Sequence, residues 1–359
     1  MVSIDNDTGA GVGEATNVGA VNRCRAASSG CPMLAEGSTV PQAGADRTNG
    51  APMDEQRYRE AERALWKFVG LEPAERRVDL PCSGGKIRVQ VVGDGEPALF
   101  IHGGPNSGST WAPVLPYLTG LRCYIVDRPG TGLSDPFVLR DDIHGFAARF
   151  GAEVLDALDL QHAHLVASSF GGFLALMSAA KTPQRFDRMV QMACPAFVPG
   201  MKTPLFMKAI GVPPLRWLMN TLPPNERVGK QVLTQIGHGK SIKAGKIPKP
   251  FFDWYLALQR DTDTMRNDSA MIAGAITRKG VRPELTIPDS VFSSVTAPTL
   301  FLWGEDDTFG GKAEAEHVVR VMPHAELVML ADSGHLPWID DPKLVGERTL
   351  EFLATKNAP

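Results

Sequence analysis

The sequence lacks features that would place it in several classes of protein. It contains no apolar run of about 18 residues, the length that a membrane-spanning helix needs. Its charge is nearly balanced, with 37 Lys and Arg against 40 Asp and Glu, whereas nucleic-acid binders usually carry a basic surface. Its first residues show neither the basic nor the apolar region of a secretory signal. We therefore expect a cytoplasmic protein with no membrane span and no nucleic-acid partner.

Cysteine is also sparse. The five cysteines are odd in number and scattered, and none has the spacing of a metal site. We expect free or buried thiols and no bound metal.

The first 52 residues lack large apolar side chains almost entirely. They contain no Phe, Trp, Tyr or Lys and a single Leu. Such a segment buries too little apolar surface to offset the entropy cost of ordering. We predict that residues 1–52 are disordered.

From residue 53 onwards the chain alternates between short apolar runs and amphipathic stretches. Continuous apolar runs predict buried strands, and a spacing of three to four residues predicts helices. Strand–helix alternation is typical of an α/β fold with a mostly parallel twisted sheet and helices on both faces. Predicted strands lie at 77–80, 86–92, 97–101, 123–126, 164–167, 188–192, 299–303 and 326–330, and predicted helices at 54–69, 143–158, 173–180, 312–322 and 342–354.

This alternation breaks between residues 195 and 287. Proline and glycine are frequent there, the helical pieces are short, and aromatic and Met side chains lie between them. We predict a helical lid over an apolar pocket at this point. The expected organisation is a core of residues 53–194 and 288–359 with the lid, 195–287, inserted.

The run Ala167-Ser168-Ser169-Phe170-Gly171 joins a predicted strand to a predicted helix. A small-x-Ser-x-Gly turn of this kind leaves its central residue strained and projecting, and the spacing to Gly171 selects Ser169. Ser169 would stand at a helix N-terminus, where N–H groups favour negative charge, and the Phe170 N–H would point to where an oxyanion forms.

A serine hydroxyl needs a base, and the base needs an orienting carboxylate. Two later strand ends supply them, Trp303-Gly304-Glu305-Asp306-Asp307 and Ser333-Gly334-His335. Asp307 is favoured by its place in the loop, with adjacent Glu305 and Asp306 as alternatives and Asp135 as a weaker one. The order Ser169, Asp307, His335 places all three at the carboxyl ends of strands, where open α/β sheets carry their sites.

These three motifs together resemble those of the α/β-hydrolase superfamily. The resemblance covers about residues 75–355 and departs from the pattern at Ala167, where glycine is usual. It implies an α/β-hydrolase fold, a Ser169-His335-Asp307 triad and no organic cofactor. Through the run His102-Gly103-Gly104-Pro105 it also implies that the Gly104 N–H is the second oxyanion donor. Trp111 and Trp338 are expected to line the pocket, with ordinary core packing as the alternative.

The resemblance leaves the reaction open, because one fold hosts many chemistries. Our first prediction is a hydrolase that cleaves a small or medium apolar ester through an acyl-enzyme. A carbon–carbon bond hydrolase acting on a diketone-like compound and an aminopeptidase use the same triad. A non-hydrolytic lyase, a perhydrolase or a ligand-binding protein is the alternative from another class. The expected partner is a small-molecule substrate, and a homodimer is left open.

Overall fold

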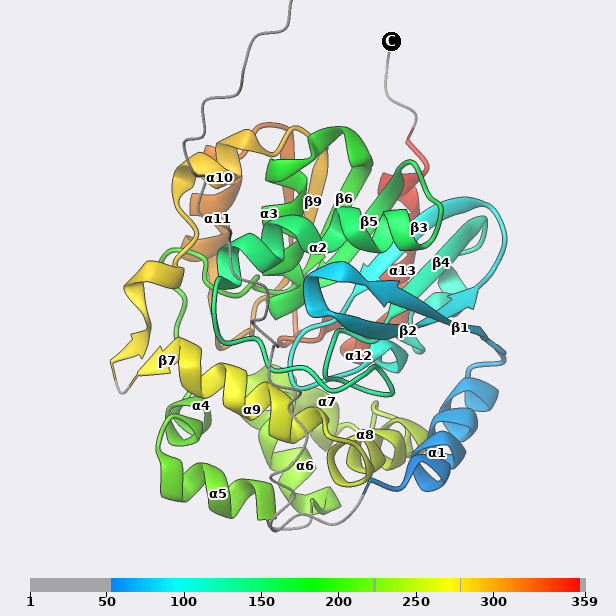
Figure 1. Ribbon diagram of the computed structural model, residues 1–359, viewed down its shortest axis with the longest axis vertical. Helices are drawn as coiled ribbons and strands as arrows, with labels where there is room; N and C mark the ends of the chain where they lie inside the picture. Colours follow the sequence, from blue (N-terminus) through cyan, green and yellow to red (C-terminus); the bar gives the residue numbers. More distant parts are fainter. Residues whose placement is uncertain (1–52, 222–223, 278, 356–359) are drawn as a thin grey trace, which may run out of the picture. The chain divides into compact units, whose positions relative to one another are not determined.

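An eight-stranded sheet forms the centre of the part of the chain that the structure describes (Figure 1). The structure is a computed structural model that describes residues 53–221, 224–277 and 279–355. The predicted disordered segment, residues 1–52, lies outside the described residues. The strand order is β1-β2-β4-β3-β5-β6-β9-β10. The strands are Ala74–Leu80 (β1), Gly85–Val92 (β2), Glu96–Ile101 (β3), Leu121–Val126 (β4), Ala163–Ser168 (β5), Phe186–Met192 (β6), Thr299–Gly304 (β9) and Ala325–Leu330 (β10).

Most neighbouring strands in this sheet are parallel. Only β2 runs antiparallel to its two neighbours. A tight turn through Pro81–Ser83 joins β1 to β2, whereas parallel strands need longer crossover connections. All six residues of β5 are buried, as expected for a central strand covered on both faces. The predicted mostly parallel α/β fold is confirmed.

Helices cover both faces of the sheet (Figure 1). On one face, α2 (Ile143–Ala157) and α3 (Ser169–Lys181) pack against each other, with α10 (Asp289–Ser294) and α11 (Lys312–Val321) beside them. The Ser178 hydroxyl donates to the Ala147 carbonyl at 2.7 Å and accepts from the Gly151 N–H at 2.9 Å, which ties α3 to α2. On the other face lies α13 (Pro342–Leu353).

Residues 195–287, called here the inserted segment, lie between β6 and α10. In Figure 1 their helices gather beyond one end of the sheet. Since residues of this segment share a cavity with Ser169 at the end of β5, that end is the carboxyl end of the parallel strands. The elements are α4 (Leu205–Ile210), α5 (Pro213–Thr221), α6 (Glu226–Leu233), a π-helical turn (Thr234–His238), α7 (Gly239–Lys243), α8 (Lys249–Asp261), α9 (Thr264–Ala275), β7 (Ile276–Thr277), β8 (Gly280–Val281) and a 3-10 helical turn (Pro283–Leu285).

Helix α1 (Glu55–Phe68) packs against α8 of the inserted segment. Asp54 caps it by accepting from the Arg57 N–H at 3.0 Å. Its buried face does not follow the spacing of apolar residues alone, because Phe68 is 58% exposed whereas Glu62 is buried. The difference arises because Glu62 forms a buried ion pair with Arg88 of β2 at 2.6 Å, which a search for apolar spacing does not detect.

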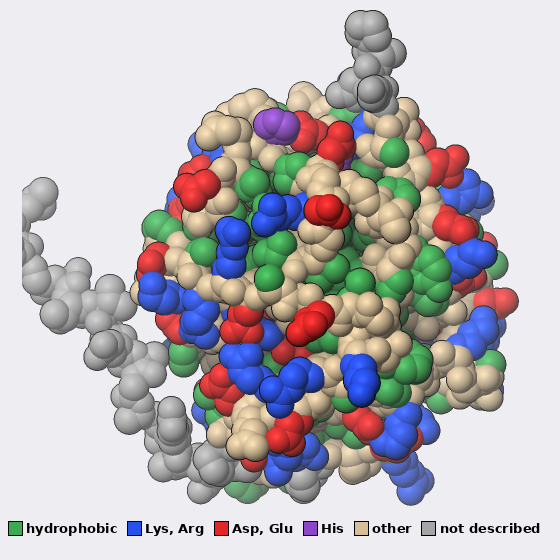
Figure 2. Space-filling view, turned by 90° about the vertical axis from the view of Figure 1, so that its right-hand side faces the viewer, with side chains coloured by type: hydrophobic (Ala, Val, Ile, Leu, Met, Phe, Trp, Pro, Cys, Tyr) green, Lys and Arg blue, Asp and Glu red, His purple; other side chains and the backbone are tan. Residues whose placement is uncertain are grey.

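Acidic and basic side chains are interspersed on the face that Figure 2 shows. Some of the charged side chains form ion pairs, such as Arg59 of α1 with Glu75 of β1 at 2.8 Å. Within the described ranges, no helix is both long and apolar enough to cross a membrane.

Candidate active site

Ser169 occupies the turn between β5 and α3. Its φ is +52°, in the left-handed region that residues other than glycine seldom adopt. Helix α3 begins at Ser169 itself. A β-carbon at Gly171 would collide with the carbonyl oxygen of Ile101 in β3, so only glycine lets the helix approach the sheet this closely. The sequence thus forms the predicted sharp turn, with Ser169 at the carboxyl end of the central strand.

Asp307 and His335 meet at the ends of two neighbouring strands. Asp307 follows β9 and His335 follows β10, which pair in parallel. His335 Nδ1 lies 2.9 Å from Asp307 Oδ2, and both side chains are buried. The Asp307 carboxylate also accepts from the N–H groups of Cys194 (3.0 Å) and Phe309 (2.9 Å). Since an ionised carboxylate only accepts hydrogen bonds, His335 carries its proton on Nδ1 and leaves Nε2 free to act as a base.

The other acids weighed from the sequence lie elsewhere. Glu305 is exposed. Asp306 pairs with Lys240 of α7 at 2.8 Å. Asp135 forms an ion pair with Arg77 of β1. Of the four acids weighed from the sequence, Asp307 is the one that contacts His335.

Ser169 and His335 open into one cavity, called here the Ser169 cavity. Its volume is about 140 Å³. An apolar protein cavity of about 150 Å³ holds one benzene molecule, so the Ser169 cavity has room for an apolar group of about that size. Among the described residues that line it, none is Lys, Arg, Asp or Glu. The apolar lining from the inserted segment comprises Ala196, Phe197, Met201, Phe206, Met207, Ile210, Met219, Val232, Leu233, Ile236, Met265, Met271, Ile272, Ala275 and Ile276.

The two predicted oxyanion donors also line the Ser169 cavity. Phe170 is the second residue of α3, and the first N–H groups of a helix have no partner within the helix. Gly104 lies in the loop after β3. A β-carbon on its neighbour Gly103 would lie 2.7 Å from Ser169 Cβ, so this loop runs directly against the serine. The arrangement can place two backbone donors beside the Ser169 hydroxyl.

Two side chains hold the peptide between Gly103 and Gly104. The Gly103 carbonyl oxygen lies 2.6 Å from His102 Nδ1 and 3.0 Å from Arg128 Nη2. His102 Nε2 accepts from the Arg128 N–H at 3.1 Å, so its proton is on Nδ1 and points at the carbonyl. Burial, assisted by the Arg128 charge, lowers the pKa of His102 and keeps the ring neutral. In a trans peptide the N–H points opposite to the carbonyl, so these contacts set the direction of the Gly104 N–H.

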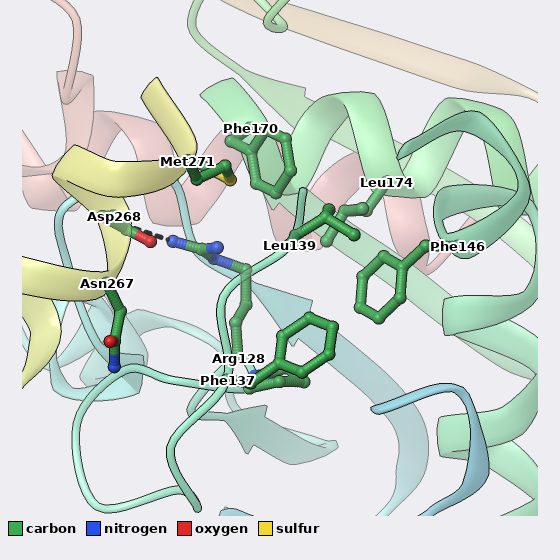
Figure 3. A pocket seen from close by; sticks show the side chains of 10 residues that line it. Arg128, Phe137, Leu139, Phe146, Phe170, Leu174, Asn267, Asp268 and Met271 are labelled. Atoms are coloured by element: carbon green, nitrogen blue, oxygen red, sulfur yellow. Dashed lines mark hydrogen bonds and ion pairs between the residues drawn. The ribbon is translucent and has the colours of Figure 1, made fainter. Parts of the chain in front are cut away.

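Arg128 is itself held by the inserted segment. Its Nη2 lies 2.8 Å from Asp268 Oδ2 of α9, and both side chains are buried. Figure 3 shows this pair, with the guanidinium below the ring of Phe170, 5.1 Å from the ring centre. Burial raises the pKa of Asp268, and the Arg128 charge opposes that rise. Sequence reasoning missed this pair because its members are 140 residues apart and no local motif marks Asp268.

Arg128→Met is expected to lower the free energy of unfolding by about 3–5 kcal/mol, because it leaves the Asp268 carboxyl buried without its cation. Since a carboxyl with a raised pKa is uncharged at low pH, the loss should be smaller at about pH 5 than at about pH 8. Denaturant unfolding at the two pH values measures it. The double variant Arg128→Met, Asp268→Leu should recover most of the stability. A single variant as stable as wild type would contradict this prediction.

Trp111 and Trp338 lie in the core and are not among the residues that line the Ser169 cavity. Their rings pack against each other, with centres 4.3 Å apart. Trp338 Nε1 donates to the Thr110 carbonyl at 2.8 Å. The structure thus agrees with the alternative of ordinary core packing, since both rings are fully buried and Trp111 also packs against Phe100 of β3.

Comparison with known proteins identifies the family. The sequence profile described as "Alpha/beta hydrolase family" matches residues 98–348, and the chain belongs to this family. It is 26% identical over 292 residues to a 2-hydroxy-6-oxononadienedioate/2-hydroxy-6-oxononatrienedioate hydrolase of Cupriavidus pinatubonensis, covering 80% of this chain and 94% of that protein. The alignment thus covers nearly the full length of this relative.

Solved structures show the same fold. Carboxylesterase CesB of Bacillus subtilis superposes with a TM-score of 0.64 at 20% identity, covering 84% of this chain and 98% of that one. The 2-hydroxy-6-oxo-6-phenylhexa-2,4-dienoate hydrolase of Rhodococcus sp. superposes with a TM-score of 0.62 at 19% identity, covering 79% and 100%. The predicted α/β-hydrolase fold is therefore confirmed.

Proposed function

We propose that this chain is a serine hydrolase that cleaves a small or medium, uncharged apolar ester. One observation carries the proposal: Ser169 and the Asp307-paired His335 face the same cavity, whose described lining has no charged Lys, Arg, Asp or Glu side chain. An apolar wall favours an apolar acyl group, and a few polar groups at one end orient its carbonyl.

The proposed reaction begins when His335 Nε2 takes the proton of the Ser169 hydroxyl as its oxygen attacks the carbonyl carbon. Asp307 orients the imidazole and stabilises its charged form. The N–H groups of Gly104 and Phe170 hold the oxyanion. His335 then gives its proton to the leaving alcohol, which leaves an acyl-enzyme. A water molecule activated by His335 attacks the acyl-enzyme and releases the acid.

Carbon–carbon bond hydrolysis is the second candidate, and the named relatives support it better than they support ester hydrolysis. The Cupriavidus protein and the Rhodococcus protein are both named as hydrolases of 2-hydroxy-6-oxo-dienoate compounds. Such compounds carry at least one carboxylate, which calls for a cationic partner. The Ser169 cavity has none among its described lining, and Arg128 is already paired with Asp268. If this chain cleaves a carbon–carbon bond, we expect a substrate whose carboxylate remains outside the apolar part of the cavity.

The aminopeptidase alternative has less support. A substrate amine needs an acidic group, and no Asp or Glu is among the described lining residues.

Turnover of p-nitrophenyl esters is expected to depend on acyl chain length, with a maximum near hexanoate. The cavity has room for an apolar group of about the size of benzene, which has six carbon atoms, and each methylene that is buried adds about 0.8 kcal/mol until the space is filled. Initial rates for the series from acetate to decanoate measure this. A half-ester of a dicarboxylic acid with the same chain length is the matched control, and it should react more slowly because its charge would enter the apolar wall.

A 2-hydroxy-6-oxo-dienoate offered in parallel separates the two candidates. Faster cleavage of the dienoate than of any ester would overturn the ester proposal in favour of the second candidate. Cleavage of neither compound, together with no labelling of Ser169 by a fluorophosphonate, would overturn both.

A further inference from the structure

A second buried His–Asp pair lies beside the loop that carries His335. His238 is the last residue of the π-helical turn in the inserted segment and is completely buried. Its Nδ1 lies 2.8 Å from Oδ2 of Asp340. Asp340 is also buried and ends the short helix α12 (Pro337–Asp340), just after His335. The pair joins the inserted segment to the core across 102 residues of sequence.

Three consecutive backbone N–H groups, those of residues 334–336, donate to the His238–Asp340 pair or to the π-helical turn that carries His238. The Gly334 N–H donates to Asp340 Oδ2 at 2.9 Å, and the Leu336 N–H donates to His238 Nε2 at 3.1 Å. Between them, the His335 N–H donates to the carbonyl of Ile236, in the same π-helical turn, at 2.9 Å. These hydrogen bonds fix the backbone on both sides of His335. Two of the three acceptors, the Ile236 carbonyl and His238 Nε2, belong to the inserted segment.

These contacts determine which ring nitrogen of His238 carries the proton. An amide N–H can only donate, so Nε2 accepts from Leu336 and the ring proton is on Nδ1, where it points at Asp340. Asp340 Oδ2 thus accepts from both His238 and Gly334, while its Oδ1 is buried and has no hydrogen-bond partner among the described residues. Each donor in the cluster is matched to one acceptor.

We propose that His238 is a positioning residue for His335: with Asp340 it fixes the backbone on both sides of His335, so that Nε2 is aimed at Ser169 while Nδ1 bonds Asp307. The proposal rests on the proposed function, because it assumes that His335 is the base. It also makes the inserted segment a part of the catalytic apparatus as well as the wall of the cavity. The His335 ring also packs against Phe309, with ring centres 4.2 Å apart, so it has little freedom once its backbone is fixed.

His238→Ala is the direct test. Misplacing a catalytic group by about 1 Å can cost about 100-fold, so we expect kcat to fall by about 10- to 100-fold while KM changes by less than about 3-fold. A weaker bond from His335 to Asp307 should also move the acidic limb of the kcat/KM pH profile to lower pH. A role in stability alone would leave that limb in place, since the folded fraction would carry a normal site.

His162→Ala is the matched control. It removes another His–Asp contact, to Asp187 at 2.7 Å, which is exposed and lies at the opposite ends of the strands, before β5 and in β6. We expect wild-type kcat and an unchanged pH profile.

Two variants of Asp340 test the hydrogen bonds separately from the charge. Asp340→Asn keeps one carbonyl oxygen that can accept from both His238 and Gly334, and its NH2 group replaces the unpartnered oxygen, so most of kcat should remain. Asp340→Leu has a similar size and no acceptor, so kcat should fall as in His238→Ala. If His238→Ala does not fold, His238→Asn replaces it, because it keeps a donor towards Asp340 and loses the acceptor for the Leu336 N–H.

Amide hydrogen exchange of the peptide that contains residues 334–336 provides a readout that does not need a substrate. Exchange should be faster in His238→Ala than in wild type and in His162→Ala. If wild type cleaves none of the offered compounds and a fluorophosphonate does not label Ser169, the proposed function fails, and exchange alone still decides whether His238 fixes the backbone around His335. Wild-type kcat, pH profile and exchange rate in a folded His238 variant would overturn the proposal.

Discussion

Ser169→Ala is expected to lower kcat/KM by about 10,000-fold or more, whichever carbonyl compound the enzyme cleaves. In the proposed reaction the Ser169 hydroxyl forms the acyl-enzyme, and alanine leaves the cavity and the remaining contacts in place. Steady-state rates on the best p-nitrophenyl ester, together with the loss of the pre-steady-state burst, measure the effect. Stability should change little, because the side chain is small and partly exposed.

Ser168→Ala is the control for this prediction. The two serines are adjacent, but the Ser168 hydroxyl is buried at the end of β5 and has no hydrogen-bond partner among the described residues. Removing it should leave kcat within about 3-fold of wild type, and it should not lower stability, since an unpaired buried hydroxyl contributes no hydrogen bond. If Ser168→Ala were inactive and Ser169→Ala active, the assignment of the nucleophile would be wrong.

Asp307→Asn is expected to lower kcat/KM by about 1,000- to 10,000-fold, which corresponds to about 4–5.5 kcal/mol of transition-state stabilisation. The carboxylate accepts from His335 Nδ1 and from two backbone N–H groups, whereas an amide must turn its NH2 group towards one of these donors. When the NH2 group faces His335, the ring proton moves to the wrong nitrogen; in either orientation the imidazolium loses its counter-charge. The same ester assay, run from about pH 5 to pH 9, measures the loss.

Asp306→Asn tests whether Asp307 is the right one of the adjacent acids. Asp306 pairs with Lys240 near the surface, so its neutralisation should change kcat/KM by less than about 3-fold. Equal losses in the two variants would contradict the assignment of Asp307 as the partner of His335.

The sequence predicts best those features that depend on residues close together in the chain. The strand–turn–helix around Ser169 is specified by an apolar run, small neighbours and a helix-forming segment within about 15 residues. The loops that carry Asp307 and His335 are equally local, and the order of the three motifs predicts that they meet at the strand ends.

The contacts that bring distant segments together were not predictable from a single sequence. The partners of Arg128 and His238 lie more than 100 residues away, and neither Asp268 nor Asp340 belongs to a motif with a required spacing. Trp111 and Trp338 show the same limit, because an indole suits a cavity wall and a core equally well. The homodimer, the cytoplasmic location and the disorder of residues 1–52 stay predictions.

The Arg128–Asp268 pair also has a consequence for exchanging parts between members of the family. A graft that replaces residues 195–287 with the corresponding segment of another hydrolase would appear to change only specificity, since that segment supplies most of the apolar wall. It would also remove Asp268 and leave the buried Arg128 cation without its counter-ion beneath the Gly103–Gly104 peptide. A chimera of this kind would therefore need a carboxylate at the equivalent point of the donor segment, or a neutral residue in place of Arg128. Its specificity could be exchanged as a module only together with that electrostatic match.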